Sequence, residues 1–201
     1  MLLQINAIKL SPQKPFTWAS GWQSPIYCDN RLTLSYPGIR NVIKAGLKEC
    51  SEQFQPFDIV VGVATAGIPH GLLLAEALDL PFAYVRSKAK AHGRQNQIEG
   101  HVEPGQRAIV IEDLISTGGS LIKAIAAVRE AGIEIAGALA IFTYGFQASI
   151  DNLASADVDF DTLSNYDDLL EEAIKLSYIR ESDLETLKAW RTSPQNWKPI
   201  N

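Results

Sequence analysis

Short, uninterrupted apolar runs recur along the chain and define its expected framework. Residues 58–64, 82–86, 108–111 and 135–143 lack the alternation of apolar and polar positions that half-exposed strands have. Strands that are buried on both faces of a parallel sheet show this pattern. We therefore predict four buried strands, with a further strand over 157–163 at one edge of the sheet.

Apolar positions at helical spacing predict helices over 37–54, 68–80, 121–131, 166–176 and 184–190. A short helix is also expected within residues 1–15, ending before Pro12 and Pro15, and Ser182 with Glu185 predicts a capping box before the last helix. Strands that alternate with helices predict an α/β fold with an open, mostly parallel sheet flanked by helices. Such sheets bind ligands at the carboxyl ends of their strands.

No repeat, low-complexity tract or linker divides the 201 residues, so a single domain is expected. It would consist of an N-terminal hood over 1–35, an α/β core over 36–163 and C-terminal helices over 164–201.

Segment 16–31 is rich in aromatic and turn-forming residues, and it predicts two short antiparallel strands around Gly21, outside the main sheet. Its Trp18, Trp22 and Tyr27 would either cover a sheet edge or form a hood over a planar base. Composition alone leaves both interpretations open.

The charge and cysteine content narrow the class of protein. The formal net charge is −5 and no basic run stands out, which argues against a nucleic-acid partner. Cys28 and Cys50 form no CxxC pair, so we expect neither a disulfide framework nor a zinc site. The first 15 residues do not resemble a signal peptide, and the most apolar run, 135–142, is too short to span a bilayer. A cytoplasmic protein is therefore expected.

The most informative stretch runs from the strand at 108–111 into the helix that begins near Leu121. Glu112 and Asp113 stand where that strand is expected to end, and hydroxyls and glycines follow over 116–120. Backbone N–H groups at a helix N-terminus bind phosphate, whereas carboxylates accept hydrogen bonds from sugar hydroxyls. An isolated acidic pair would more often only cap a strand. With this loop directly behind it, the pair favours a ribose that carries a 5′-phosphate.

Two further segments fit a polyanionic ligand. Residues 65–67 form a small-residue turn between a strand and a helix, whose N–H groups would suit a pyrophosphate. Residues 87–103 lack periodicity and carry Lys88, Lys90, His92 and Arg94. Such a loop is either a solvated basic segment or a mobile lid that closes over a polyanion.

These motifs resemble those of the type I phosphoribosyltransferases, and most closely the orotate phosphoribosyltransferases. EDLISTGGS at 112–120 is similar to their signature for phosphoribosyl pyrophosphate (PRPP). The FT-x-x-SG-x-x-SP-x-Y pattern at 16–27 is similar to their orotate motif, and R-x-x-x-K-x-HG at 86–93 to their lid. The turn at 62–69 and YGF at 144–146 also fit, the latter resembling a bacillus-type branch.

The resemblance implies transfer of the phosphoribosyl group of PRPP to orotate, with Mg²⁺ as cofactor and no metal ligands assigned to the protein. It implies catalytic roles for Lys90 and Asp113, and a homodimer whose lids act across the subunit interface. Orotate would contact Ser116, Tyr27 and Cys28. PRPP would contact Arg86, Lys90, His92, Glu112, Asp113, Leu114, Ile115, Ser116, Thr117, Gly118, Gly119 and Ser120.

Three positions depart from other branches of the family. Ala19, Ala66 and Tyr144 stand where lysine, lysine and arginine are often found, so the contacts to the orotate carboxylate are left open. A purine or uracil phosphoribosyltransferase would share the 112–120 loop, but the aromatic N-terminal motif argues against it. A regulator that senses PRPP would be expected to carry an additional basic DNA-binding domain, for which this length leaves no room.

Overall fold

The computed structural model describes residues 1–18, 21–87 and 97–199, and its centre is a six-stranded sheet. The strand order is β10-β9-β8-β5-β6-β7, and only the β6–β7 pair is antiparallel. The strands are β5 (Ile59–Val63), β6 (Phe82–Val85), β7 (Ile98–Glu99), β8 (Arg107–Ile115), β9 (Glu134–Thr143) and β10 (Phe160–Asn165). The predicted mostly parallel α/β fold is therefore confirmed.

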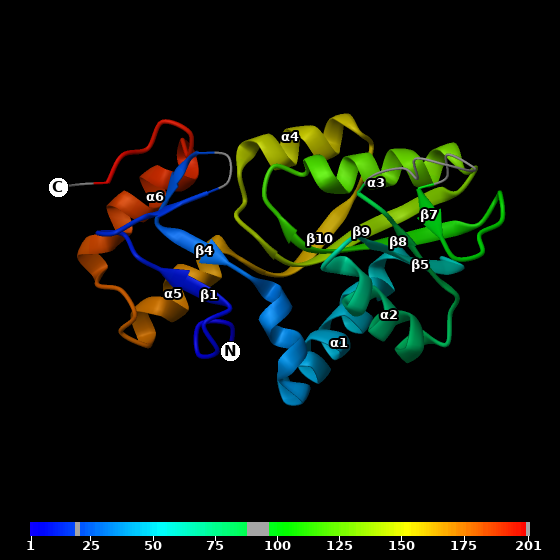
Figure 1. Ribbon diagram of the computed structural model, residues 1–201, viewed down its shortest axis with the longest axis horizontal. Helices are drawn as coiled ribbons and strands as arrows, with labels where there is room; N and C mark the ends of the chain where they lie inside the picture. Colours follow the sequence, from blue (N-terminus) through cyan, green and yellow to red (C-terminus); the bar gives the residue numbers. More distant parts are fainter. Residues whose placement is uncertain (19–20, 88–96, 200–201) are drawn as a thin grey trace.

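Helices cover both faces of this sheet (Figure 1). α1 (Pro37–Ser51) and α2 (Gly67–Leu78) lie on one face, and α3 (Gly119–Glu130) and α4 (Gln147–Ser155) on the other. Successive residues of β5 show why its apolar run is continuous. Val60 belongs to the cluster under α1 and α2, whereas Val61 and Val63 belong to the cluster under α3.

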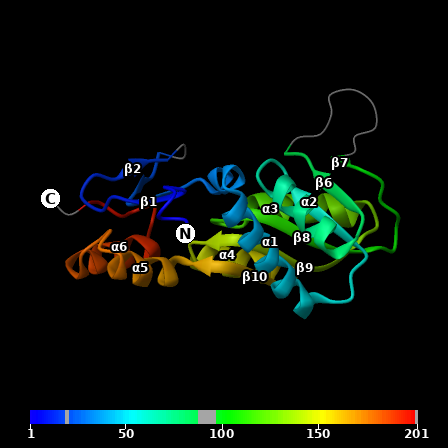
Figure 2. The same ribbon diagram turned by 90° about the horizontal axis from the view of Figure 1, so that it is seen from below.

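The hood and the C-terminal helices form a second layer beside the sheet (Figure 2). In the hood, β1 (Ile8–Leu10) pairs with β4 (Ile26–Cys28), and β2 (Phe16–Thr17) pairs with β3 (Gln23–Ser24), both antiparallel. Short 3₁₀ helices follow at η1 (Asn30–Ser35), η2 (Glu52–Phe54) and η3 (Glu181–Asp183), and the chain ends with α5 (Tyr166–Lys175) and α6 (Leu184–Thr192).

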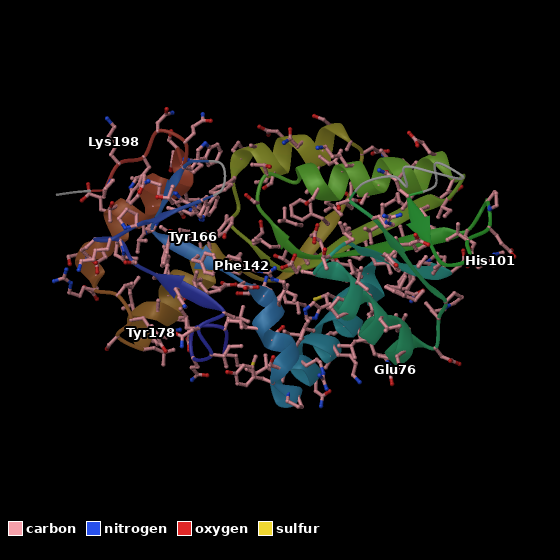
Figure 3. The ribbon with its side chains drawn as sticks, in the orientation of Figure 1. Glu76, His101, Phe142, Tyr166, Tyr178 and Lys198 are labelled. Carbon is pink, nitrogen blue, oxygen red and sulfur yellow. The ribbon has the colours of Figure 1, made fainter. Side chains whose placement is uncertain are left out.

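Aromatic rings join this second layer to the sheet. Trp190 of α6 is fully buried, with its ring centroid 5.7 Å from that of Trp18 and 5.5 Å from that of Tyr144. Phe142 and Tyr166 mark the junction between the sheet and the terminal helices (Figure 3). Trp18 therefore packs against the aromatic cluster between the sheet and the C-terminal helices.

Several predicted boundaries were wrong. The N-terminal segment contains β1 rather than a helix, because its apolar residues pair with β4. β8 continues to Ile115, past the acidic pair. The predicted Ser182/Glu185 capping box does not form, because the Asp183 carboxylate instead accepts the Arg180 backbone N–H at 2.9 Å.

Several elements were not predicted, among them β4, η1, η3, β7 and α4. β7 lies inside the segment that was expected to be an unstructured loop, and α4 follows β9.

Within the described ranges, the structure has no helix with the length and apolar character needed to cross a membrane.

Candidate active site

The site lies where the chain connections of the sheet reverse direction. β5 leads through α2 to β6 on one side, whereas β8 leads through α3 to β9 on the other. The carboxyl ends of β5 and β8 are therefore left open at a topological switch point. The pocket there has a volume of about 380 Å³. Its lining residues are Cys28, Asp29, Arg31, Ala64, Thr65, Ala66, Glu112, Asp113, Leu114 and Ser120.

Close packing of α2 against β8 brings the two halves of the pocket together. A Cβ atom at Gly67 would lie 2.3 Å from the backbone oxygen of Ile111, so the contact requires glycine. The turn that precedes Gly67 consequently lies beside Glu112, and Thr65 and Ala66 line the same pocket as the acidic pair.

Glu112 links the acidic pair to the loop that follows it. Its side chain is 5% exposed, one oxygen accepts the Asp113 backbone N–H at 3.0 Å, and the other accepts the Ser120 hydroxyl at 3.1 Å. Burial, followed by the negative charge of Asp113, raises the Glu112 pKa from its ordinary 4.5 to about 8. The free site therefore contains a carboxyl group that gains or loses its proton near neutral pH.

Asp113 is partly buried in the pocket and is held in place from the hood. The Asn30 side-chain amide donates a hydrogen bond of 2.8 Å to the Asp113 backbone oxygen. Burial raises the pKa of the Asp113 carboxyl. Glu112 and Asp113 are therefore two neighbouring carboxyl groups within the last part of β8, and both have a raised pKa.

The loop between β8 and α3 has the geometry expected of a phosphate cradle. Gly118 has a φ of +80°, a conformation that favours glycine, and α3 begins at the next residue. The Asn152 amide of α4 donates to the Thr117 backbone oxygen at 3.0 Å and fixes the turn. The N–H groups of the first turn of a helix have no partner within that helix, so those of 117–120 can bind an anion.

Hood residues complete the pocket, and sequence reasoning missed part of them. Asp29 and Arg31 line it together with Cys28. The Tyr27 side chain is 40% exposed and its ring lies 5.8 Å from that of Phe16. Burial raises the pKa of Cys28, so this pocket residue is a thiol and not a thiolate.

Arg86 and Ile115 are not among the residues that line this pocket. Arg86 follows β6, and its guanidinium lies 3.6 Å from the Glu99 carboxylate. The Ile115 side chain is buried in the core, so only its backbone could face a ligand. The predicted lid residues Lys90 and His92 lie outside the described residues.

Comparisons with known proteins identify relatives along nearly the whole chain. A family model described as "Phosphoribosyl transferase domain" matches residues 34–162. An orotate phosphoribosyltransferase of Cytophaga hutchinsonii is 52% identical over 198 residues, covering 98% of this chain and 95% of that protein. An orotate phosphoribosyltransferase of Listeria monocytogenes is 53% identical over 197 residues, which cover 98% of this chain and 94% of that protein. The crystal structure of the Aeropyrum pernix orotate phosphoribosyltransferase has a TM-score of 0.78 at 30% identity. The match covers 89% of this chain and 97% of that one.

The fold, the acidic pair and the glycine loop behind it define a class, and the family model agrees: the protein is a phosphoribosyltransferase. Within that class the chain belongs to the orotate phosphoribosyltransferases, because it is more than half identical to members of that family over almost their full length. The family and the pentosyltransferase class predicted from the motifs are thus confirmed.

Proposed function

We propose that this protein transfers the phosphoribosyl group of PRPP to orotate, which gives orotidine 5′-monophosphate and pyrophosphate in pyrimidine biosynthesis. The bond between ribose C1 and pyrophosphate breaks, and a bond between C1 and a ring nitrogen of orotate forms. The observation that carries the proposal is the pocket at the ends of β5 and β8. It joins the Glu112–Asp113 pair to Ser120 and to the turn at Thr65.

The ground state of PRPP would be bound by three parts of this pocket. The N–H groups and hydroxyls of 116–120 would bind the 5′-phosphate. Glu112 and Asp113 would accept hydrogen bonds from the ribose hydroxyls, and the turn at 65–67 would donate N–H groups to the pyrophosphate. Because Ser120 bonds to Glu112 in the free pocket, PRPP binding would exchange this hydrogen bond for contacts with the ligand.

The chemical step needs charge stabilisation more than a strong base. As pyrophosphate leaves, positive charge develops on the ribose, and the adjacent Asp113 carboxylate would stabilise it. Arg86, Lys90 and His92 would neutralise the departing pyrophosphate. Ser116 and the backbone of Tyr27 and Cys28 would contact orotate.

Mg²⁺ is part of this proposal. Asp113 lines the pocket, and carboxylate oxygens are among the ligands that Mg²⁺ prefers. The ion would bind mainly to PRPP and keep several of its waters. When bound, it would neutralise charge on the pyrophosphate.

The proposal also covers the assembly. We expect a cytoplasmic homodimer in which the part of residues 87–103 that precedes β7 closes, from one subunit, over the active site of the other. The family resemblance supports this sharing, and the mixed-dimer experiment described below tests it.

An absorbance assay with a panel of bases tests the proposed reaction. Ultraviolet absorbance of orotate should fall only when PRPP and Mg²⁺ are both present. Turnover of adenine or hypoxanthine in place of orotate would reject the proposal.

A further inference from the structure

The charges that line the pocket do not suit an anionic base. Asp29, Glu112 and Asp113 contribute three carboxyl groups, whereas Arg31 is the one basic side chain among the described residues that line it. Orotate carries its own carboxylate on the ring carbon next to the nitrogen that attacks ribose C1. Its carboxylate must therefore lie within a few ångströms of the reacting atoms, and hence near Asp113, where an unpaired anion would be repelled.

Two hydrogen bonds orient the Arg31 side chain at the pocket. Its Nε donates to one Asp29 carboxylate oxygen at 2.6 Å, and its Nη2 donates to the other at 2.9 Å. Asp29 also caps η1 by accepting the Arg31 backbone N–H at 3.3 Å. Asn30, between them, is fully buried and is bonded to the backbone of Asp113. The Asp29–Arg31 unit is therefore fixed to the strand that carries the acidic pair.

The bonded geometry leaves one edge of the guanidinium available. A guanidinium has five N–H donors in a planar fork, of which Asp29 uses two. The remaining edge, formed by Nη1 and Nη2, can bind a carboxylate through two parallel hydrogen bonds. The side chain is 63% exposed, so a ligand can reach this edge.

We infer that Arg31 binds the carboxylate of orotate, with Asp29 as the residue that orients it. The inference rests on the proposed function and deepens it by naming the residue that selects an anionic pyrimidine over a neutral one. Arg31 belongs to the same hood segment as Tyr27 and Cys28, on the side of the pocket expected to hold the base. The turn at 65–67, which would hold pyrophosphate, approaches from α2 instead.

Steady-state kinetics of Arg31→Ala with orotate and with uracil, which lacks the carboxylate, test the inference. Loss of one charge-assisted bidentate contact should lower kcat/KM for orotate by about 10- to 100-fold. It should leave the KM for PRPP, and any turnover of uracil by the wild type, nearly unchanged. Arg31→Lys keeps the charge but loses the fork, so it should fall between the wild type and Arg31→Ala.

Arg180→Ala is the matched control. Arg180 is likewise exposed and close to an aspartate of its own segment, Asp183 at 3.5 Å, but it lies at η3, away from the pocket. It should keep wild-type kinetics. If Arg31→Ala instead raised the KM for PRPP and left that for orotate unchanged, Arg31 would serve the pyrophosphate and the inference would be wrong. If the wild type itself failed to use orotate, the proposed function would fail first, so the two failures are distinguishable.

Discussion

Replacing Glu112 by glutamine should make the protein more resistant to unfolding at alkaline pH. The glutamine has nearly the same shape, and its amide can still accept the Asp113 N–H and donate to the Ser120 hydroxyl. The change therefore removes a titratable group and keeps the hydrogen bonds of the pair. Its effect on stability should depend on pH.

The raised pKa of Glu112 gives the direction and size of this effect. Between pH 4.5 and about 8 the folded protein retains a proton that the unfolded chain has lost. The free energy of unfolding therefore falls as pH rises through this window and levels off above about 8. A pKa raised from 4.5 to about 8 corresponds to about 5 kcal/mol, at about 1.4 kcal/mol for each pH unit. Water in the open pocket screens part of this, so we expect about 2–3 kcal/mol between pH 5 and pH 9.

Urea unfolding of wild type and Glu112→Gln at matched protein concentration, over this pH range, measures the difference. The advantage of the variant should grow steadily from pH 5 to about pH 8. Glu130→Gln, at the exposed end of α3, removes one carboxylate outside the pocket and is the matched control. If the difference in free energy of unfolding between Glu112→Gln and wild type stayed constant, or shrank as pH rises, burial would not raise the Glu112 pKa and the reasoning would be refuted.

Three further predictions address the chemistry, the packing and the assembly. Asp113→Asn should lower kcat together with kcat/KM, because it removes charge near the developing cation, whereas Ser120→Ala should mainly raise the KM for PRPP; steady-state kinetics showing the reverse would mean that the roles are exchanged. Gly67→Ala should lower the free energy of unfolding by about 1–3 kcal/mol in urea titrations, because its Cβ has no room. Gly38→Ala, with open space around it, should not destabilise the protein, and equal effects of the two changes would contradict the close packing of α2 against β8. Lys90→Ala and Asp113→Ala should each give nearly inactive homodimers. Mixing the two variants should restore roughly a quarter of wild-type activity, because mixed dimers have one intact site; no recovery, once subunit exchange is confirmed, would reject a shared site.

The parts of the site that could be predicted from the sequence are those contiguous in the chain. Glu112 to Ser120 combines its acidic pair, turn glycine and helix start within nine residues, so local chemistry was sufficient to place the loop. The place of Arg31 in the pocket could not be predicted from neighbouring residues in the sequence. It depends on Asn30 bonding to Asp113, which lies 83 residues away in the sequence. A single sequence gives no sign of such a long-range hydrogen bond.

The fold shows the same limit. The central strands were predictable because burial on both faces leaves a continuous apolar run. The segment at Ile8–Leu10 was wrongly predicted as helix. So short a segment, with two apolar residues, fits the spacing of a helix as well as that of a strand, and only its pairing with β4 makes it a strand. α4 was missed because it buries few side chains, among them Ser149 and Leu153, and so has a weak apolar stripe.

A crystal structure of the protein with orotidine 5′-monophosphate would show where the phosphate, the ribose and the base bind. We expect the phosphate among the N–H groups of 117–120 and the ribose hydroxyls on Glu112 and Asp113. The carboxylate of the base should face the free edge of Arg31. A nucleotide bound with its phosphate at the turn of 65–67, or outside the pocket between β5 and β8, would contradict this expectation.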